Sequence, residues 1–270
     1  MLANRGDHLF VVINAACRDA DIALMRAGLP AGVTLEVIED RALLALQGPL
    51  AEDVLAGLNP AVRAMRFMDV ADLDLAGATC WVSRSGYTGE DGYEISVPAD
   101  AAEDLARALL SDERVEAIGL GARDSLRLEA GLCLYGHDID AHTSPIEAGL
   151  GWAIQKVRRT GGARAGGFPG AARILSELDG KAPRARVGLL PEGRAPMREG
   201  VELFTTAEGG HPIGRVTSGG FGPTVGAPVA MGLVARDHAT VGTQLYGEVR
   251  GKRLPVTVVT LPFTPANFKR

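Results

Sequence analysis

The stretch from Ser83 to Val97, "SRSGYTGEDGYEISV", carries the strongest local signal for the fold. From Tyr93 onward apolar and polar residues alternate, and successive side chains of a β-strand point to opposite faces of its sheet. We therefore expect Tyr93, Ile95 and Val97 on one face and Glu94 on the other. This pattern predicts a half-buried strand whose second face carries a carboxylate.

Three glycines precede this strand at every third position, Gly86, Gly89 and Gly92. Glycine lets the backbone approach a ligand closely, so the run is consistent with an open cradle. Glu94 can accept two parallel hydrogen bonds from an amino-pyrimidine edge, and Tyr87 offers a ring face to the same flat molecule. The alternative interpretation is a glycine-rich surface turn with solvated acids.

Around this stretch, residues 39–120 contain two similar strand-to-helix units, "ALLALQGPLAEDVLAGL" and "GYEISVPADAAEDLARALL". Between them "DLDLAGATCWVSRS" is typical of a hairpin, and "RVEAIGL" after them is consistent with a closing strand. The order βαββαβ predicts an antiparallel sheet with both helices on one face.

At the start of the chain, "MLANRGDHLFVVIN" predicts a turn at residues 4–7 and a strand from His8 to Ile13, and the next stretch, residues 17–29, predicts a helix. The arm that enters the turn looks too short to pair this strand, so we expect that upstream sequence is missing. From about residue 184, short alternating stretches between Gly and Pro turns predict a small β-barrel.

Composition and charge limit the function. The 46% hydrophobic and 23% charged content is ordinary for a globular protein. The net charge of −5 argues against non-specific nucleic-acid binding, which requires a positive surface. No apolar run is long enough to span a bilayer and no signal peptide follows Met1, so we expect a soluble, unexported, cytoplasmic protein without a membrane partner.

A second candidate region begins with "GLGARDSLRLE", which has helical spacing. Arg123 and Arg127 lie one helical turn apart in it, and such like charges repel unless an acid or an anionic ligand compensates them.

The loop that follows contains five potential metal ligands, and a metal-dependent hydrolase is the alternative from a different class: His137, Asp138, Asp140, His142 and Glu147. No recognised metal motif surrounds them. Neither a nucleophile elbow nor a phosphate-binding loop is present either.

Many ordered stretches resemble the T proteins of the glycine cleavage system, the folate-dependent aminomethyltransferases. They include "NRGDHLFVVINAACRDAD", "SRSGYTGEDGYEISVP", "ARDSLRLEAGLCLYGHDIDAHTSPIEAGLGW", "IGRVTSGGFGPTV" and "PFTPANF". The resemblance runs from the first residues to the end of the chain.

The resemblance implies an α+β fold of three domains around a central hole that holds tetrahydrofolate. The first domain is split over residues 1–38 and 121–180, the second is ferredoxin-like at 39–120, and the third is the barrel at 181–270. The implied reaction transfers the methylene of an aminomethyl group from the lipoyl arm of the carrier (H) protein to tetrahydrofolate, with release of ammonia and without a metal.

The resemblance also implies roles for individual residues. Tyr87 and Glu94 would hold the pteridine, and Asn14 with the region of Phe10 would line its pocket. The indole of Trp152 would pack against the folate. The remaining two, Arg123 and Arg186, would be polar anchors near the anionic glutamate tail.

One departure from the family pattern concerns catalysis. The family's assisting aspartate would fall ahead of Met1, so no catalytic residue is assigned and weak or no transferase activity is expected from these residues alone. A non-catalytic folate-binding protein and a folate-dependent demethylase module are the alternatives, although no flavin domain is present. A folate-binding iron-sulfur assembly protein is disfavoured, because "RAGGFPGA" stands in place of its cysteine-containing element. In a eukaryote the expected compartment is the mitochondrion.

Overall fold

A computed structural model describes all residues, 1–270, and divides them into two compact units. The first unit comprises residues 1–85, 92–116 and 269–270, and the second comprises residues 86–91 and 117–268. The helices and strands of the first unit are β1 (Leu2–Asn4), β2 (Leu9–Val11), α1 (Arg18–Gly28), β3 (Arg41–Gln47), α2 (Ala51–Leu58), β4 (Val70–Leu75), β5 (Ala78–Ser83), β6 (Gly92–Pro98) and α3 (Ala102–Leu110).

The second unit contains two helices and six strands. They are α4 (Leu120–Glu129), α5 (Ala171–Ser176), β7 (Arg184–Pro191), β8 (Glu202–Phe204), β9 (Gly214–Gly222), β10 (Ala227–Ala235), β11 (Gln244–Val249) and β12 (Lys252–Val259). Short helical turns lie at Ala15–Cys17, Pro60–Ala64, Ala99–Ala101, Gly151–Ala153, Lys156–Arg158, Glu177–Lys181 and Arg236–His238. No helix is long and apolar enough to cross a membrane.

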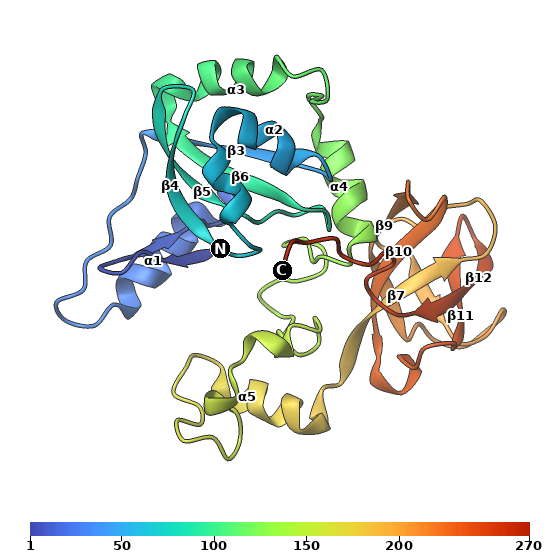
Figure 1. The fold of residues 1–270 in the computed structure, drawn as a ribbon. Coiled ribbons are helices and arrows are strands. Elements are labelled where there is room, and N and C mark those ends of the chain that lie inside the picture. The colour runs from blue at the N-terminus through green and yellow to red at the C-terminus, as the bar shows by residue number, and fades with distance from the viewer. The chain divides into compact units, whose positions relative to one another are not determined.

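The first unit is built on a four-stranded sheet in the order β3-β6-β5-β4, and every neighbouring pair is antiparallel. Helices α2 and α3 cover one face of this sheet (Figure 1). As predicted, Tyr93, Ile95 and Val97 of β6 point to that face and are fully buried, together with Leu55 of α2 and Leu105 of α3. The alternation has period two because the backbone of a strand is pleated.

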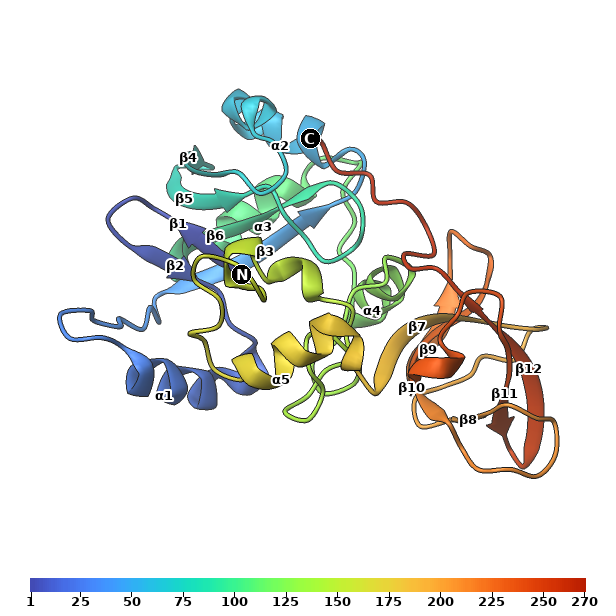
Figure 2. The ribbon, with the colours of Figure 1, turned by 90° about the horizontal axis from the view of Figure 1, so that it is seen from below.

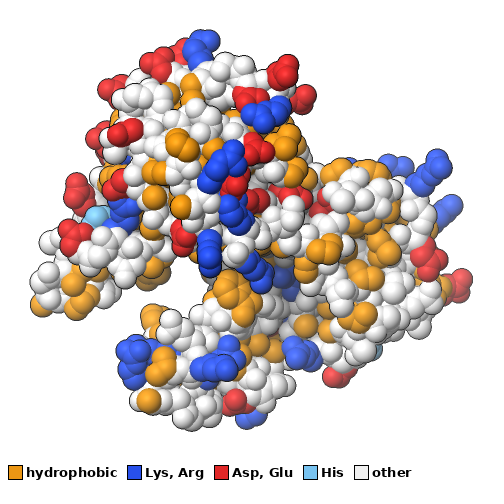
Figure 3. Space-filling view, viewed as in Figure 1, with side chains coloured by type: hydrophobic (Ala, Val, Ile, Leu, Met, Phe, Trp, Pro, Cys, Tyr) orange, Lys and Arg blue, Asp and Glu red, His pale blue; other side chains and the backbone are white.

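The outer face of α3 is acidic, as expected for an amphipathic surface helix. Leu105 and Leu109 face the core, whereas Glu103 and Asp104 lie in the first turn. Figure 3 shows Asp and Glu side chains over the part of the first unit that carries this helix. The acids also lie near the helix N-terminus, where the helix dipole favours negative charge.

The predicted closing strand "RVEAIGL" is wrong. Residues 114–119 form no strand, and the sheet ends at β3 and β4. Only Val115 packs against the core, while Ile118 and Leu120 are 61% and 83% exposed. A strand needs a repeating buried side, and this segment offers one partly buried side chain, Val115.

The predicted turn at the start of the chain is present, but the expectation about its incoming arm is corrected. The arm β1 pairs β2 in full register, from Leu2 opposite Val11 to Asn4 opposite Leu9. The predicted strand from His8 to Ile13 shortens to Leu9–Val11, so a three-residue arm suffices. The helix predicted for residues 17–29 is α1.

The barrel predicted from residue 184 onward is confirmed. Its six strands close in the order β10-β7-β12-β11-β8-β9, and Figure 2 shows them as one group. The interior is filled by apolar side chains, among them Leu189, Leu203 and Leu245. Helix α4 packs against the barrel through Leu128, which contacts Val229 and Met231. The three-domain boundaries stay a prediction.

Candidate functional site

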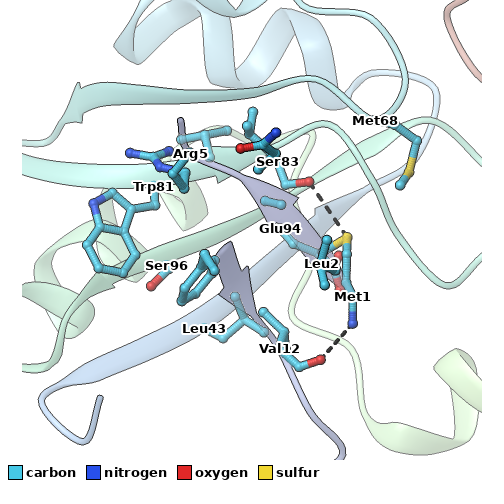
Figure 4. A pocket seen from close by; sticks show the side chains of 15 residues that line it. Met1, Leu2, Arg5, Val12, Leu43, Met68, Trp81, Ser83, Glu94 and Ser96 are labelled. Carbon is cyan, nitrogen blue, oxygen red and sulfur yellow. Dashed lines mark hydrogen bonds between the residues drawn. The ribbon is translucent and has the colours of Figure 1, made fainter. Parts of the chain in front are cut away.

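A cavity of about 250 Å³ lies in the first unit between the β1–β2 hairpin and the sheet face that the helices leave uncovered. Figure 4 shows its walls. The hairpin side is lined by Met1, Leu2, Ala3, Asn4, Arg5, Phe10 and Val12, and the sheet side by Leu43, Met68, Val70, Trp81, Val82, Ser83, Glu94 and Ser96. The lining is mainly apolar with a few polar groups, which is typical of a small-molecule site.

Glu94 is the carboxylate of this cavity. The register of the sheet places it opposite Ser83 of β5, on the face turned away from the helices. The Ser85 hydroxyl donates to Glu94 Oε2 at 2.7 Å, and the Ser83 and Ser85 hydroxyl oxygens are 2.8 Å apart. This hydrogen bond from the chain engages Oε2 and leaves Oε1 without a donor from the chain. The carboxylate is thus oriented by the chain and keeps accepting capacity for a ligand.

An aromatic wall stands beside this carboxylate. Phe10 meets Trp81 edge to face, with ring centroids 5.0 Å apart and an interplanar angle of 73°. The Arg41 guanidinium lies 3.9 Å from the Trp81 ring centroid and donates to the Ser96 hydroxyl at 2.9 Å. These contacts hold the indole in one orientation.

The strand pattern and the family resemblance predicted Glu94 and Phe10 at the site, but neither predicted Trp81 and Ser83 of the cavity lining or Ser85, which orients Glu94. The alternation of Trp81 and Ser83 along one strand was the available signal, because it puts them on one side. Asn14, in contrast, is exposed ahead of the short helical turn Ala15–Cys17 and does not line the cavity. Its folate contact stays a prediction.

In the second unit Tyr87 is paired with Arg123, one of the two arginines of α4. The guanidinium lies 4.9 Å from the centre of the Tyr87 ring. The Tyr87 hydroxyl donates to the carbonyl oxygen of Cys133. Burial, as the largest cause, raises the pKa of Tyr87 to about 12. Tyr87 is therefore a neutral hydrogen-bond donor over the physiological range, and Arg123 forms no ion pair within the chain.

This raised pKa predicts a loss of stability in alkali. The unfolded tyrosine ionises near pH 10, whereas the folded one ionises at about 12. The stabilising contribution is therefore complete below pH 10 and is lost as the pH rises to 12. We expect the free energy of unfolding, measured with urea at pH 9 and pH 11, to decrease less in Tyr87→Phe than in the unchanged protein. An equal decrease in both proteins would contradict this assignment.

The other two predicted folate contacts of the second unit have different surroundings. Arg186 donates to the carbonyl oxygens of Ala148 at 2.8 Å and Gly131 at 2.7 Å, so most of its donors serve the chain itself. Trp152 lies in the turn Gly151–Ala153 with its side chain 78% exposed. Such exposure is unusual for tryptophan.

Two of the three glycines of the quoted stretch, Gly89 and Gly92, serve internal packing, which corrects the open-cradle interpretation at these positions. Gly89 has a φ of +80°, and an added Cβ would lie 2.7 Å from Ala130 Cβ. At Gly92 an added Cβ would lie 2.6 Å from the Leu46 carbonyl oxygen. Both positions exclude a side chain because the chain's own backbone and side chains occupy the space.

The acidic loop considered as a metal site is saturated by arginines and hydroxyls. Asp138 is fully buried and accepts hydrogen bonds from Arg127 at 2.9 Å and Ser218 at 2.8 Å. Glu147 accepts from Arg173 at 2.8 Å and Arg184 at 2.7 Å, which hold its pKa below the ordinary value against the opposing effect of burial. The oxygens that a metal would need are therefore in use, and the hydrolase alternative loses its support.

Two family models match most of the chain. The family described as "GCVT N-terminal domain" matches residues 1–158, and "Glycine cleavage T-protein C-terminal barrel domain" matches residues 184–264. A solved structure, glycine cleavage system aminomethyltransferase T from Bartonella henselae, is 44% identical, with a TM-score of 0.85 over 95% of this chain and 69% of its own.

The relatives named "Aminomethyltransferase, mitochondrial" include proteins from a mammal and a plant. The Mus musculus protein is 49% identical over 271 residues, and the Solanum tuberosum protein is 44% identical over 271 residues. Each match covers 97% of this chain and 65% of the relative, so the chain spans about two thirds of the relatives' length.

These matches define the class as an α+β protein with the T-protein fold, a helix-covered antiparallel sheet combined with a C-terminal barrel. The chain belongs to the glycine cleavage T-protein family.

Proposed function

We propose that the protein is a tetrahydrofolate-dependent aminomethyltransferase and that Glu94 binds the amino-pyrimidine end of the folate. The observation that carries the proposal is a carboxylate oxygen without an internal partner, held in an apolar cavity beside an aromatic wall. The names of the relatives support the reaction class.

The recognition chemistry follows from the geometry of the cavity. A pterin has a donor-rich edge and two flat apolar faces, and Glu94 matches the edge while the apolar lining matches the faces. The low polarity of the lining strengthens the charged hydrogen bond, because water competes less for it. This part of the protein would bind and orient the folate and exclude water from it.

In the proposed reaction, the carbon–sulfur and carbon–nitrogen bonds of the aminomethyl group on the lipoyl arm break. Two new bonds to folate nitrogens form in place of their two N–H bonds, and of the two protons released one leaves with ammonia and the other goes to the lipoyl sulfur. Such a transfer depends mainly on holding two substrates in the reactive geometry. The lipoyl carrier (H) protein is the proposed donor partner. We place the protein in the cytoplasm of a prokaryote or in the mitochondrion of a eukaryote.

Roles for the remaining family positions belong to the same proposal. Arg123 keeps an uncompensated positive charge, which supports a contact with the anionic glutamate tail. Tyr87 would contribute its ring, since its hydroxyl is bound to Cys133. Arg186 would contribute the guanidinium nitrogen left over by its two carbonyl contacts. For Trp152, the exposed ring supports packing against the folate.

The decisive experiment combines the protein with tetrahydrofolate and aminomethylated carrier protein, and measures ammonia and methylene-tetrahydrofolate. We expect weak turnover from these residues alone, with the two products in equal amounts and neither product when either substrate is left out. Calorimetric titration with tetrahydrofolate is run in parallel. Binding without product would identify a non-catalytic folate-binding protein, and absence of binding would refute the folate proposal altogether.

A further inference from the structure

The β1–β2 hairpin supplies seven of the fifteen residues that line the cavity. Its hydrogen bonds are satisfied internally: β1 pairs β2, the Arg5 amide donates to the His8 carbonyl oxygen at 2.9 Å, and the Asn4 side chain accepts from Gly6 at 3.0 Å. The hairpin is therefore a self-contained wall that can move without breaking its own backbone hydrogen bonds.

Few contacts join this wall to the sheet. No backbone hydrogen bond connects residues 1–12 with the four-stranded sheet. The two hydrogen bonds between them are made by side chains: Arg5 donates to Asp72, and the Ser83 hydroxyl lies 3.8 Å from the Met1 sulfur. Two contacts with the Trp81 ring, the edge of Phe10 and the guanidinium of Arg5, add to the attachment.

Arg5 is the strongest of these attachments because it makes two contacts at the turn end of the hairpin. Its guanidinium pairs with Asp72 of β4 and lies 5.8 Å from the Trp81 ring centroid. The Arg5 side chain is 16% exposed, whereas that of Asp72 is 51% exposed. Asp72 lies opposite Trp81 in the β4–β5 register, so one arginine reaches two neighbouring strands of the sheet.

We propose that the Arg5–Asp72 ion pair is a latch that holds the β1–β2 hairpin over the cavity and limits how fast a ligand enters and leaves it. The ligand class, a flat donor-rich heteroaromatic ring, rests on the function proposed above. The latch acts on opening of the hairpin, and its acidic partner Asp72 does not line the cavity. Releasing it therefore speeds binding and dissociation by the same factor and leaves the affinity unchanged.

The test is stopped-flow measurement of tetrahydrofolate binding and dissociation, with Arg5→Gln and Asp72→Asn. Loss of an exposed ion pair changes an opening equilibrium about two- to fivefold, so we expect both rate constants to rise by that factor in both variants. Because Asp72 does not line the cavity, Kd should stay constant in Asp72→Asn. The exchanged pair, Arg5→Asp with Asp72→Arg, should restore slow dissociation. In the unchanged protein dissociation should accelerate with salt, and in Arg5→Gln it should not.

The matched control is Arg18→Gln, which removes the ion pair of Arg18 with Glu39 in the same unit, outside the cavity, and should change neither rate. Unchanged rates in Arg5→Gln, or a weaker Kd with an unchanged association rate, would overturn the latch. The latter result would instead identify Arg5 as a ligand contact.

A measurement without ligand separates the latch from the proposed function. The chain has two tryptophans, so Trp152→Phe isolates the fluorescence of Trp81. In that background Arg5→Gln should increase quenching of Trp81 by acrylamide, because the hairpin opens more often. If quenching increases but tetrahydrofolate does not bind the unchanged protein, the folate proposal fails and the latch stands. If quenching does not change, the latch is refuted.

Discussion

Replacing Glu94 by alanine is expected to weaken tetrahydrofolate binding at least about 100-fold, the largest effect on binding that we predict. A hydrogen bond to a charged group contributes about 1.5–3 kcal/mol, and a factor of 100 corresponds to about 2.7 kcal/mol. Loss of two such bonds to the pterin edge meets that threshold. Calorimetric titration of Glu94→Ala against the unchanged protein measures the effect.

Two controls separate recognition from folding. Asp74→Ala removes another carboxylate from the same sheet, which is exposed and bonded to Thr79 at 2.7 Å, and should leave Kd unchanged. Glu94→Gln keeps the shape of the side chain and one acceptor, and should bind with intermediate affinity. An affinity of Glu94→Ala within threefold of the unchanged protein would contradict the assignment of this carboxylate.

Replacing Asp138 by alanine is expected to lower the free energy of unfolding by about 3–5 kcal/mol, the usual cost of breaking a buried ion pair. The carboxylate is fully buried, and the side chain of its partner Arg127 is 3% exposed. Removing Asp138 leaves the guanidinium charged in a site that water does not reach, and it also removes the acceptor of Thr217 and Ser218. Urea unfolding followed by circular dichroism measures the loss.

The other acidic partner of Arg127 provides a matched control. Asp124 accepts from the same guanidinium at 2.6 Å and 2.8 Å, yet its side chain is 60% exposed. Because water screens this pair, Asp124→Ala should cost less than about 1 kcal/mol. Equal losses for the two variants would show that burial does not determine the strength of the Arg127 network.

Several structural predictions succeed because they depend on local geometry. The alternation around Glu94 identifies β6 and its two faces, and the repeated short strands after residue 184 identify the barrel. The segment "RVEAIGL" fails for the opposite reason. Its composition is compatible with a strand. Strand formation also depends on pairing with the edge of a sheet and on burial of one face, and a stretch of seven residues indicates neither.

The residues of the candidate site divide in the same way, into those that the local sequence indicates and those that only packing identifies. Glu94 stands out because a carboxylate interrupts an apolar strand, and a resemblance to known T proteins points to it as well. Trp81 carries no such signal, since its role depends on Arg41 and Phe10, which approach it from other elements. The glycines at positions 89 and 92 look suited to a ligand, whereas their packing partners are Ala130 and Leu46.

The sequence by itself determined the strands and helices with clear periodicity, the family, and the carboxylate on the outer face of β6. The tertiary structure alone decided which charges meet, such as Arg5 with Asp72 and Arg127 with Asp138. It also decided that a hairpin and a sheet enclose a cavity. Periodicity is set by backbone geometry over a few residues, whereas the partners of a side chain are chosen by packing between segments that lie far apart along the chain.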